Sequence, residues 1–152
     1  MSEKQKKQTD PNEQFLQDLY ESVCMGTDSV TTVLGKTDDA ALRMELTAQL
    51  DGYQNFANLT RNKLTELNKQ AKEVNAFAKM PAELSIMMTT MVNSSPSKIA
   101  EMMINGSTMG VIDLTRRVNR AKGEGVGADL TKLANDMIAF EEGNIGKLKA
   151  FL

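Results

Sequence analysis

Three polar side chains fall on or beside the apolar faces of predicted helices, where they could do chemistry. Glu141 and Asn144 lie three residues apart, so both point to the same side of one helix. They share that side with Leu133 and Met137. Asp113 lies at the margin of the apolar face of the preceding long helix. The sequence therefore offers Asp113, Glu141 and Asn144 as a buried polar cluster that could bind a small cation or a polar ligand.

A structural role for the same cluster is the interpretation that we favour. Asp113 is followed by Arg116 and Arg117, at the spacings where an acidic and a basic side chain pair along a helix. A half-buried carboxylate without a partner is costly, so we expect an ion pair that orients Asp113 and could extend to Glu141.

The composition excludes several kinds of site. The chain of 152 residues has no histidine and no tryptophan, and Cys24 is its single cysteine. A disulfide within the chain, a Cys/His zinc site and catalysis by histidine are therefore excluded. We expect Cys24 to be a small buried hydrophobic residue and not a nucleophile. The prediction is a protein that is not an enzyme and has no cofactor or metal.

Charge and hydropathy predict where the protein works. The formal net charge is −2, which gives no basic surface for nucleic acid. Residues 1–10 are charged and polar, lack the apolar core of a secretory signal, and are predicted to be a disordered tail. The longest uncharged stretch has 14 residues, fewer than the roughly 20 that span a bilayer. These features favour a cytoplasmic protein without a membrane segment.

The elements that must position the polar cluster are helices. Apolar residues recur at three- and four-residue steps over 11–34, about 38–74, 96–122 and 129–152, and a short amphipathic helix is expected over 81–92. Pro11 and Pro96 suit first helical positions after the N-caps Asp10 and Ser95. We expect Thr37 and Asp129 to cap the other two long helices, and Gly35 to close the first in a left-handed conformation.

The connections between these helices predict an all-α four-helix bundle in one domain, residues 11–152. Tight breaks at Gly35 and at 123–127 make two antiparallel hairpins. The segment that joins the hairpins has about twenty residues, enough to cross the length of the bundle. We favour this crossover over a plain up-down-up-down bundle with the Pro81 segment packed on one end.

The helix pattern and Glu141-x-x-Asn144 together resemble the ferritin-like superfamily. Intact members of that superfamily bind two metal ions through one carboxylate on the first and third helices and a Glu-x-x-His on the second and fourth. On this resemblance Glu141-x-x-Asn144 stands in place of the last Glu-x-x-His, and Asp113 is a remnant of the third-helix carboxylate. The implied fold is a ferritin-like four-helix bundle with a crossover that contains a short extra helix.

Departures from the family pattern indicate that the metal chemistry is lost. In the second helix Asp51-x-x-Gln54 has its carboxylate on the solvent side. In the first helix Asp18, Glu21 and Asp28 are predicted to project away from the apolar stripe. Two inward carboxylates remain where the family uses four carboxylates and two histidines, too few ligands for a pair of metal ions.

Methionines and glycines have two interpretations each. Seven of the eleven methionines lie between residues 80 and 109, which is typical of a core packed with methionine. Alternatively, an apolar face of the connecting segment contacts a second subunit; its residues would be Leu84, Ile86, Met87, Met88 and Met91. The glycines within helices either allow close helix contacts or are simply tolerated; the candidates for close contact are Gly106, Gly110, Gly143 and Gly146.

The sequence thus favours a non-catalytic helical bundle that acts through self-association, as a homodimer or larger homo-oligomer, or by docking a protein partner. One alternative is a degenerate ferritin-like protein that binds a metal or small ligand at Asp113, Glu141 and Asn144, with or without ligands from another subunit. Another is a structural protein of a bacterial coat or stress layer.

Overall fold

The computed structural model describes residues 9–92 and 94–152, and their regular secondary structure is entirely helical, with no strand among them. Four long helices dominate the chain: α1 (Pro11–Leu34), α2 (Ala40–Glu66), α5 (Pro96–Ala121) and α6 (Ala128–Leu148). Two short helices, α3 (Ala76–Lys79) and α4 (Ala82–Thr90), lie in the long connection, and a 3₁₀ turn (Lys149–Phe151) follows α6. The all-α prediction is confirmed.

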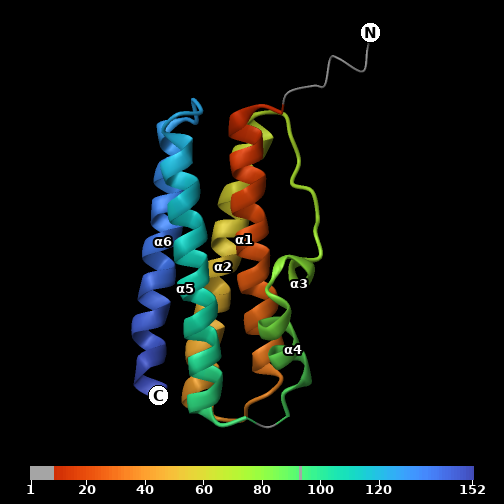
Figure 1. Ribbon diagram of the computed structural model, residues 1–152, viewed down its shortest axis with the longest axis vertical. Helices are drawn as coiled ribbons and strands as arrows, with labels where there is room; N and C mark the ends of the chain where they lie inside the picture. Colours follow the sequence, from red (N-terminus) through yellow and green to blue (C-terminus); the bar gives the residue numbers. More distant parts are fainter. Residues whose placement is uncertain (1–8, 93) are drawn as a thin grey trace.

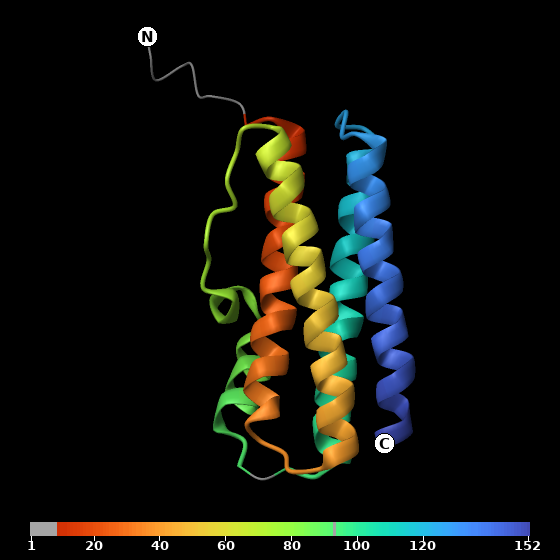
Figure 2. The ribbon, with the colours of Figure 1, turned by 180° about the vertical axis from the view of Figure 1, so that it is seen from behind.

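The long helices form two antiparallel hairpins that pack side by side (Figure 1). α1 and α2 make the first hairpin, and α5 and α6 make the second. Between them the chain passes back along the outer side of α1, so that α2 and α5 run in the same direction (Figures 1 and 2). The connection therefore crosses the length of the bundle, as its length predicted, and we call residues 67–92 the crossover segment.

One apolar core joins all four long helices and α4. Its fully buried side chains include large aliphatic residues from every long helix, such as Leu16, Leu46, Leu114 and Leu148. Burying a side chain of this size contributes roughly 1.5–3 kcal/mol. The core thus supplies the stability that positions the polar groups described below.

Methionine fills part of this core. Met88, Met102, Met103 and Met137 are all buried, which agrees with the expectation of a methionine-packed interior. The predicted apolar face of the crossover segment is only partly present, because Met88 is buried and both Leu84 and Met91 pack against the core. α4 packs against α1 and α5, so this side of the helix faces the core.

Two of the predicted N-caps are present. The Asp10 carboxylate accepts a hydrogen bond from Asn12 N at 2.9 Å, and the Ser95 hydroxyl accepts one from Lys98 N at 3.2 Å. Pro11 and Pro96 then occupy the first helical positions, where their missing N–H costs nothing. These starts follow from local chemistry alone.

The other predicted caps are wrong by two residues. Asp39, not Thr37, caps α2 by accepting a hydrogen bond from Leu42 N at 2.8 Å. The Thr37 hydroxyl instead accepts from Asp39 N, which holds the turn before the helix. Gly127 is the N-cap of α6, so Asp129 lies in the first turn, where its charge still favours the helix dipole.

The ends of α1 and α2 also differ from the prediction. Gly35 is right-handed, at φ −75°, because α1 ends in 3₁₀-type hydrogen bonds to Thr32 and Val33. α2 ends at Glu66 and not near Val74. Asn68 takes a left-handed conformation, φ 58°, which halts the helix there.

A Schellman motif closes α2 at this point. Lys69 N donates to Leu64 O at 2.9 Å, and Asn68 N donates to Thr65 O at 2.9 Å. Among residues with a side chain, asparagine is one of the few that tolerate the left-handed region. The residues after Asn68 are therefore free to leave the helix axis and run along α1.

The crossover segment is attached to α1 by polar side chains. Gln17 Nε2 donates to Lys72 O and Gln17 Oε1 accepts from Lys72 N, both at 2.9 Å. The Tyr20 hydroxyl donates to Glu73 at 2.7 Å, and Lys79 pairs with Glu21 at 3.0 Å. These contacts hold the segment in place over one face of the bundle.

The sequence also predicted a disordered N-terminal tail and no membrane-spanning helix. The predicted tail, residues 1–10, lies outside the described residues except for Thr9 and Asp10, which are exposed. Across the described helices, none combines the length and the apolar character that a bilayer crossing requires.

Candidate ligand cavity

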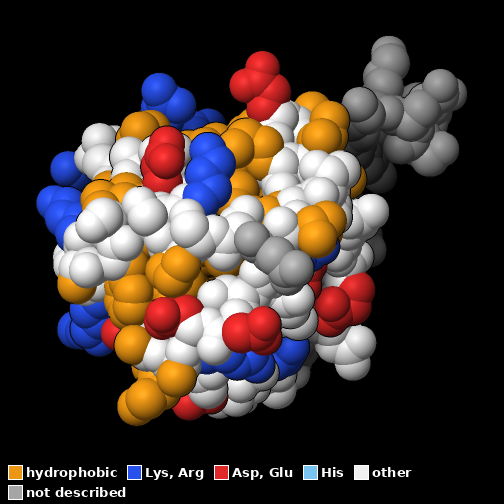
Figure 3. All heavy atoms as spheres, turned by 90° about the horizontal axis from the view of Figure 1, so that it is seen from below, with side chains coloured by type: hydrophobic (Ala, Val, Ile, Leu, Met, Phe, Trp, Pro, Cys, Tyr) orange, Lys and Arg blue, Asp and Glu red, His pale blue; other side chains and the backbone are white. Residues whose placement is uncertain are grey.

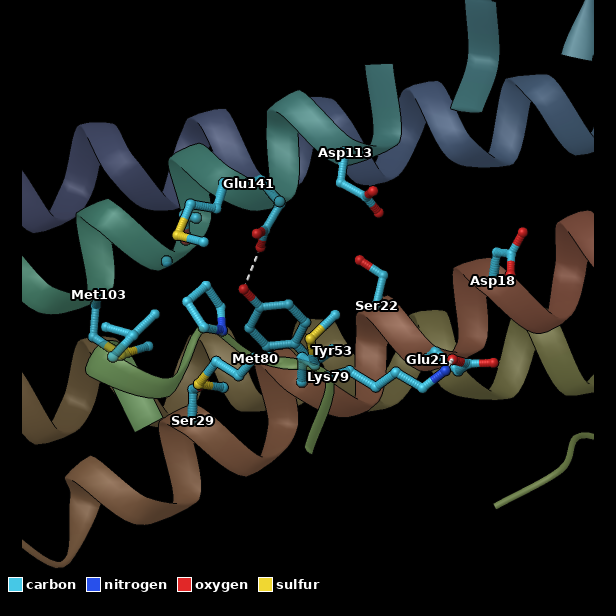
Figure 4. Close-up of a pocket in the computed structure, with 18 of the residues that line it drawn as sticks. Asp18, Glu21, Ser22, Ser29, Tyr53, Lys79, Met80, Met103, Asp113 and Glu141 are labelled. Carbon is cyan, nitrogen blue, oxygen red and sulfur yellow. Dashed lines mark hydrogen bonds and ion pairs between the residues drawn. The ribbon is translucent and has the colours of Figure 1, made fainter. Parts of the chain in front are cut away.

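A cavity of about 440 Å³ lies between α1 and α5, beneath the crossover segment. Its walls come from all four long helices, from α3 and α4, and from the residues around Pro81 (Figure 4). One part of the wall is apolar and rich in sulfur; this methionine wall consists of Met25, Met80, Met88, Met103 and Met109. Charged side chains line other parts of the wall.

Tyr53 of α2 and Glu141 of α6 form the floor of the cavity. Figure 4 shows the two side chains pointing toward each other, and the Tyr53 hydroxyl donates a hydrogen bond to Glu141 Oε1. Both residues are buried. Phe140 packs edge-on against the Tyr53 ring, with the ring centroids 5.0 Å apart. The hydrogen bond therefore joins the two hairpins at the centre of the bundle.

Glycines make the space for this floor. A Cβ on Gly26 of α1 would overlap the Tyr53 ring, and one on Gly52 would overlap Phe140. A Cβ on Gly110 of α5 would lie 2.7 Å from Glu141 Oε2. The close-contact interpretation is thus confirmed at Gly110. It is wrong for Gly143 and Gly146, which have open space around them, and Gly106 makes only an ordinary contact with Leu84.

Burial makes Glu141 a weaker acid than an ordinary glutamate. Desolvation raises the pKa of its carboxyl group from 4.5 to about 7, although the nearby Tyr53, Asn144 and Ser107 side chains favour the ionised form. The pKa of the Tyr53 hydroxyl is raised well above its usual value, first by burial and then by the negative charge of Glu141. Near neutral pH, Tyr53 is therefore a neutral donor, and both the protonated and the ionised form of Glu141 are populated.

The charged rim of the cavity is a set of ion pairs. Arg117 bridges two carboxylates: its Nη1 lies 2.7 Å from Asp18 Oδ2, and its Nε lies 2.8 Å from Asp113 Oδ2. The predicted pairing of Asp113 with an arginine is therefore confirmed for Arg117. It does not include Arg116, which is exposed, nor Glu141, which bonds to Tyr53 instead.

Asp18 and Glu21 project away from the apolar stripe of α1, as predicted, but the sequence did not predict that they face a cavity. Both line the cavity, Asp18 through its bond to Arg117 and Glu21 through Lys79. They lie off the apolar stripe of α1, as the periodicity indicated, but α5 and the crossover segment cover that side of the helix. The sequence periodicity shows which side is polar and not what covers it.

The predicted cluster of Asp113, Glu141 and Asn144 is thus only partly assembled. Asp113 and Glu141 both line the cavity. Asn144 is buried one helical turn beyond Glu141 and does not line the cavity; its amide nitrogen makes no protein hydrogen bond of normal geometry. The Oε1 atom of buried Gln49 likewise has no hydrogen-bond partner among the described residues. The remaining cavity residues, notably Tyr53 and Lys79, were missed as site residues, although Tyr53 does occupy an inward position of its helix.

Among the described residues there is no group of metal-ligating side chains, and the Cys24 thiol is not activated. Within residues 9–92 and 94–152, no three Cys, Asp or Glu side chains come close enough together to hold a metal. Cys24 is half-buried against the core, and desolvation raises the pKa of its thiol. That environment suits the predicted role of a small hydrophobic residue.

Comparisons with protein-family models, with curated proteins and with solved structures found no match to this chain.

Proposed function

We propose that this protein is a non-catalytic helical bundle that binds a small molecule in the cavity between α1 and α5. The observation that carries this proposal is the cavity itself. Its volume of about 440 Å³ falls within the range of roughly 300–1,000 Å³ typical of small-molecule sites. Such sites combine apolar walls with a few placed polar groups, and the methionine wall and the Tyr53–Glu141 floor provide that combination.

The glycines beneath the floor support the same proposal. Gly26 and Gly110 lie within helices, where each glycine costs roughly 1 kcal/mol relative to alanine. Their absence of a side chain admits a tyrosine and a glutamate into the centre of the bundle, at a place where aliphatic residues would fill the space more stably. A binding role accounts for that cost.

Self-association has less support than ligand binding. Among the large apolar residues of α4, only Ile86 and Met87 are strongly exposed, at 59% and 41%. At the end of the bundle shown in Figure 3, apolar side chains occur in several groups interrupted by charged and polar ones. Docking of a protein partner, or a structural role in a coat or stress layer, would depend on the same exposed apolar side chains and has the same limited support.

A ferritin-like origin of the scaffold stays part of the proposal. The crossover between the parallel helices α2 and α5 supports it, as does a glutamate of the last helix at the centre of the bundle. A ligand site in that place would use space that ferritin-like relatives give to metal ions.

The test is to fill the cavity from a position that tolerates a side chain. A Cβ on Gly106 meets only Leu84, at 3.9 Å, so Gly106→Phe directs a ring into the cavity, whereas Gly143→Phe directs one into solvent. We expect the neutral fluorescent probe N-phenyl-1-naphthylamine to bind the wild type and Gly143→Phe alike, and Gly106→Phe at least about tenfold more weakly. No binding to the wild type, or equal binding to all three proteins, would refute the proposal.

A further inference from the structure

The cavity that we propose as a ligand site is lined by more acidic than basic side chains. Four carboxylates line it, from Asp18, Glu21, Asp113 and Glu141, against the two cations Lys79 and Arg117. An excess of one charge in an enclosed space with low-dielectric walls attracts the opposite charge and repels its own. The cavity is therefore better suited to a cationic ligand than to an anionic one.

Both cations of the cavity are already paired. Arg117 uses Nη1 for Asp18, at 2.7 Å, and Nε for Asp113, at 2.8 Å. Lys79 Nζ contacts Glu21 at 3.0 Å. Three rim carboxylates therefore face two cations, and the carboxylate or phosphate of a ligand would have to compete with them for Lys79 and Arg117.

Glu141 differs from the other three carboxylates, because its protein partner is a neutral phenol. The Tyr53 hydroxyl donates to Oε1, and no salt bridge involves Glu141 in the described part of the chain. An ionised carboxylate that is buried without a counter-ion is strongly disfavoured. The side chain points into the cavity from the floor (Figure 4), so that a ligand could supply the missing charge.

We propose that the ligand is an amphipathic amine, whose ammonium group pairs with Glu141 and whose apolar body lies against the methionine wall. This inference rests on the proposed function and adds the chemical class of the ligand. Thioether side chains are flexible and polarizable, so a methionine wall adapts to apolar groups of different shape. A primary ammonium group has three donors, enough for Glu141 and for a neighbouring acceptor such as the Ser107 hydroxyl.

The pairing makes binding depend on pH. The charged or titratable groups around Glu141 are Tyr53 of α2, the α1 and α5 carboxylates with Arg117, and Lys79 at the end of α3. Burial raises the pKa of Glu141 itself to about 7. A primary amine, like lysine, stays protonated from pH 6 to pH 8. Because the ionised carboxylate is the form that binds, we expect amine affinity to rise about tenfold over this interval.

The experiment compares three probes of equal chain length: n-octylamine, 1-octanol and octanoate. Each is titrated against N-phenyl-1-naphthylamine bound to the wild type, to Glu141→Gln and to Glu142→Gln. Glu142 is the matched control, since it carries the same charge on the same helix but is exposed. We expect the wild type and Glu142→Gln to bind octylamine at least about tenfold more tightly than octanol at pH 8, and Glu141→Gln to lose this preference.

Outcomes that overturn this inference differ from those that overturn the proposed function. Equal binding of octylamine and octanol, tighter binding of octanoate, or an amine preference that persists in Glu141→Gln would show a ligand site of another class. If neither the probe nor any of the three compounds binds the wild type, the cavity is not a ligand site and both proposals fail.

Discussion

The carboxyl group of Glu141 links the cavity to the stability of the fold. Its pKa is 4.5 as an ordinary glutamate and about 7 in the folded protein, because burial disfavours the charged form. A group whose folded pKa is raised holds its proton more tightly in the native state. Its stabilising contribution is complete below the unfolded pKa and is lost as the pH rises through the folded pKa.

We therefore expect Glu141→Gln to change the pH dependence of stability. The two pKa values correspond to about 3 kcal/mol, so from pH 4.5 to pH 8 the wild type should lose about that much relative to the variant. Glutamine keeps an oxygen that can accept the Tyr53 hydroxyl but has no charge to bury. Urea unfolding of both proteins at several pH values measures the difference, and parallel pH profiles would show that burial of the Glu141 charge is not its cause.

At the scale of elements, single glycines set how closely helices approach. Gly110 of α5 lies against the Glu141 carboxylate of α6, whereas Gly143 of α6 has nothing within 4 Å of its Cβ position. Glycine therefore has different structural roles at these two positions of one hairpin. At Gly110 the missing side chain is required by the packing, and at Gly143 it only weakens the helix.

This contrast predicts opposite effects of alanine at the two positions. Gly143→Ala should raise the free energy of unfolding by roughly 1 kcal/mol, the ordinary gain within an exposed helix. Gly110→Ala should lower it, by about 1–3 kcal/mol, because the new methyl group displaces the Glu141 carboxylate from the Tyr53 hydroxyl. Thermal unfolding monitored by circular dichroism separates them; a stabilised Gly110→Ala would show that the contact is not tight.

At the scale of the whole molecule, the crossover segment is the cover of the cavity. Its residues Lys79 and Met80 lie over the space between α1 and α5 (Figure 4), and Pro81 also lines the cavity. Gln17 and Tyr20 hold the earlier part of the segment on α1. Residues 70–75 lie outside the helices, so local opening of this segment costs less than unfolding of the bundle. Opening would give a ligand access to the floor.

Loss of the Gln17 bonds should therefore expose the crossover segment without unfolding the bundle. Gln17→Met keeps the side-chain length and removes two hydrogen bonds of about 1 kcal/mol each, so the opened form should become at least about tenfold more populated. Limited trypsin digestion followed by mass spectrometry would detect faster cleavage after Lys69 and Lys72. Gln14→Met, on the exposed side of α1, should digest like the wild type, and equal rates for both variants would disprove the anchoring role.

Much of the architecture could be predicted from local signals. Pro11 and Pro96, preceded by Asp10 and Ser95, mark two helix starts because a missing N–H and a capping oxygen act within three residues. The predicted end of α2 was wrong, since the apolar spacing continues past Asn68 although the backbone turns there. A single left-handed residue outweighs a periodic pattern, and the periodicity does not reveal it.

The sequence by itself determined the four long helices, the long connection between the hairpins, and the inward positions of Tyr53 and Glu141, since each depends on residues a few positions apart. Only the tertiary structure decided that Tyr53 bonds to Glu141, that Arg117 reaches Asp18, and that the polar side of α1 faces a covered cavity. Those contacts join residues from different helices. Their partners depend on how the hairpins are rotated and where the crossover segment lies, which the packing of the whole core decides.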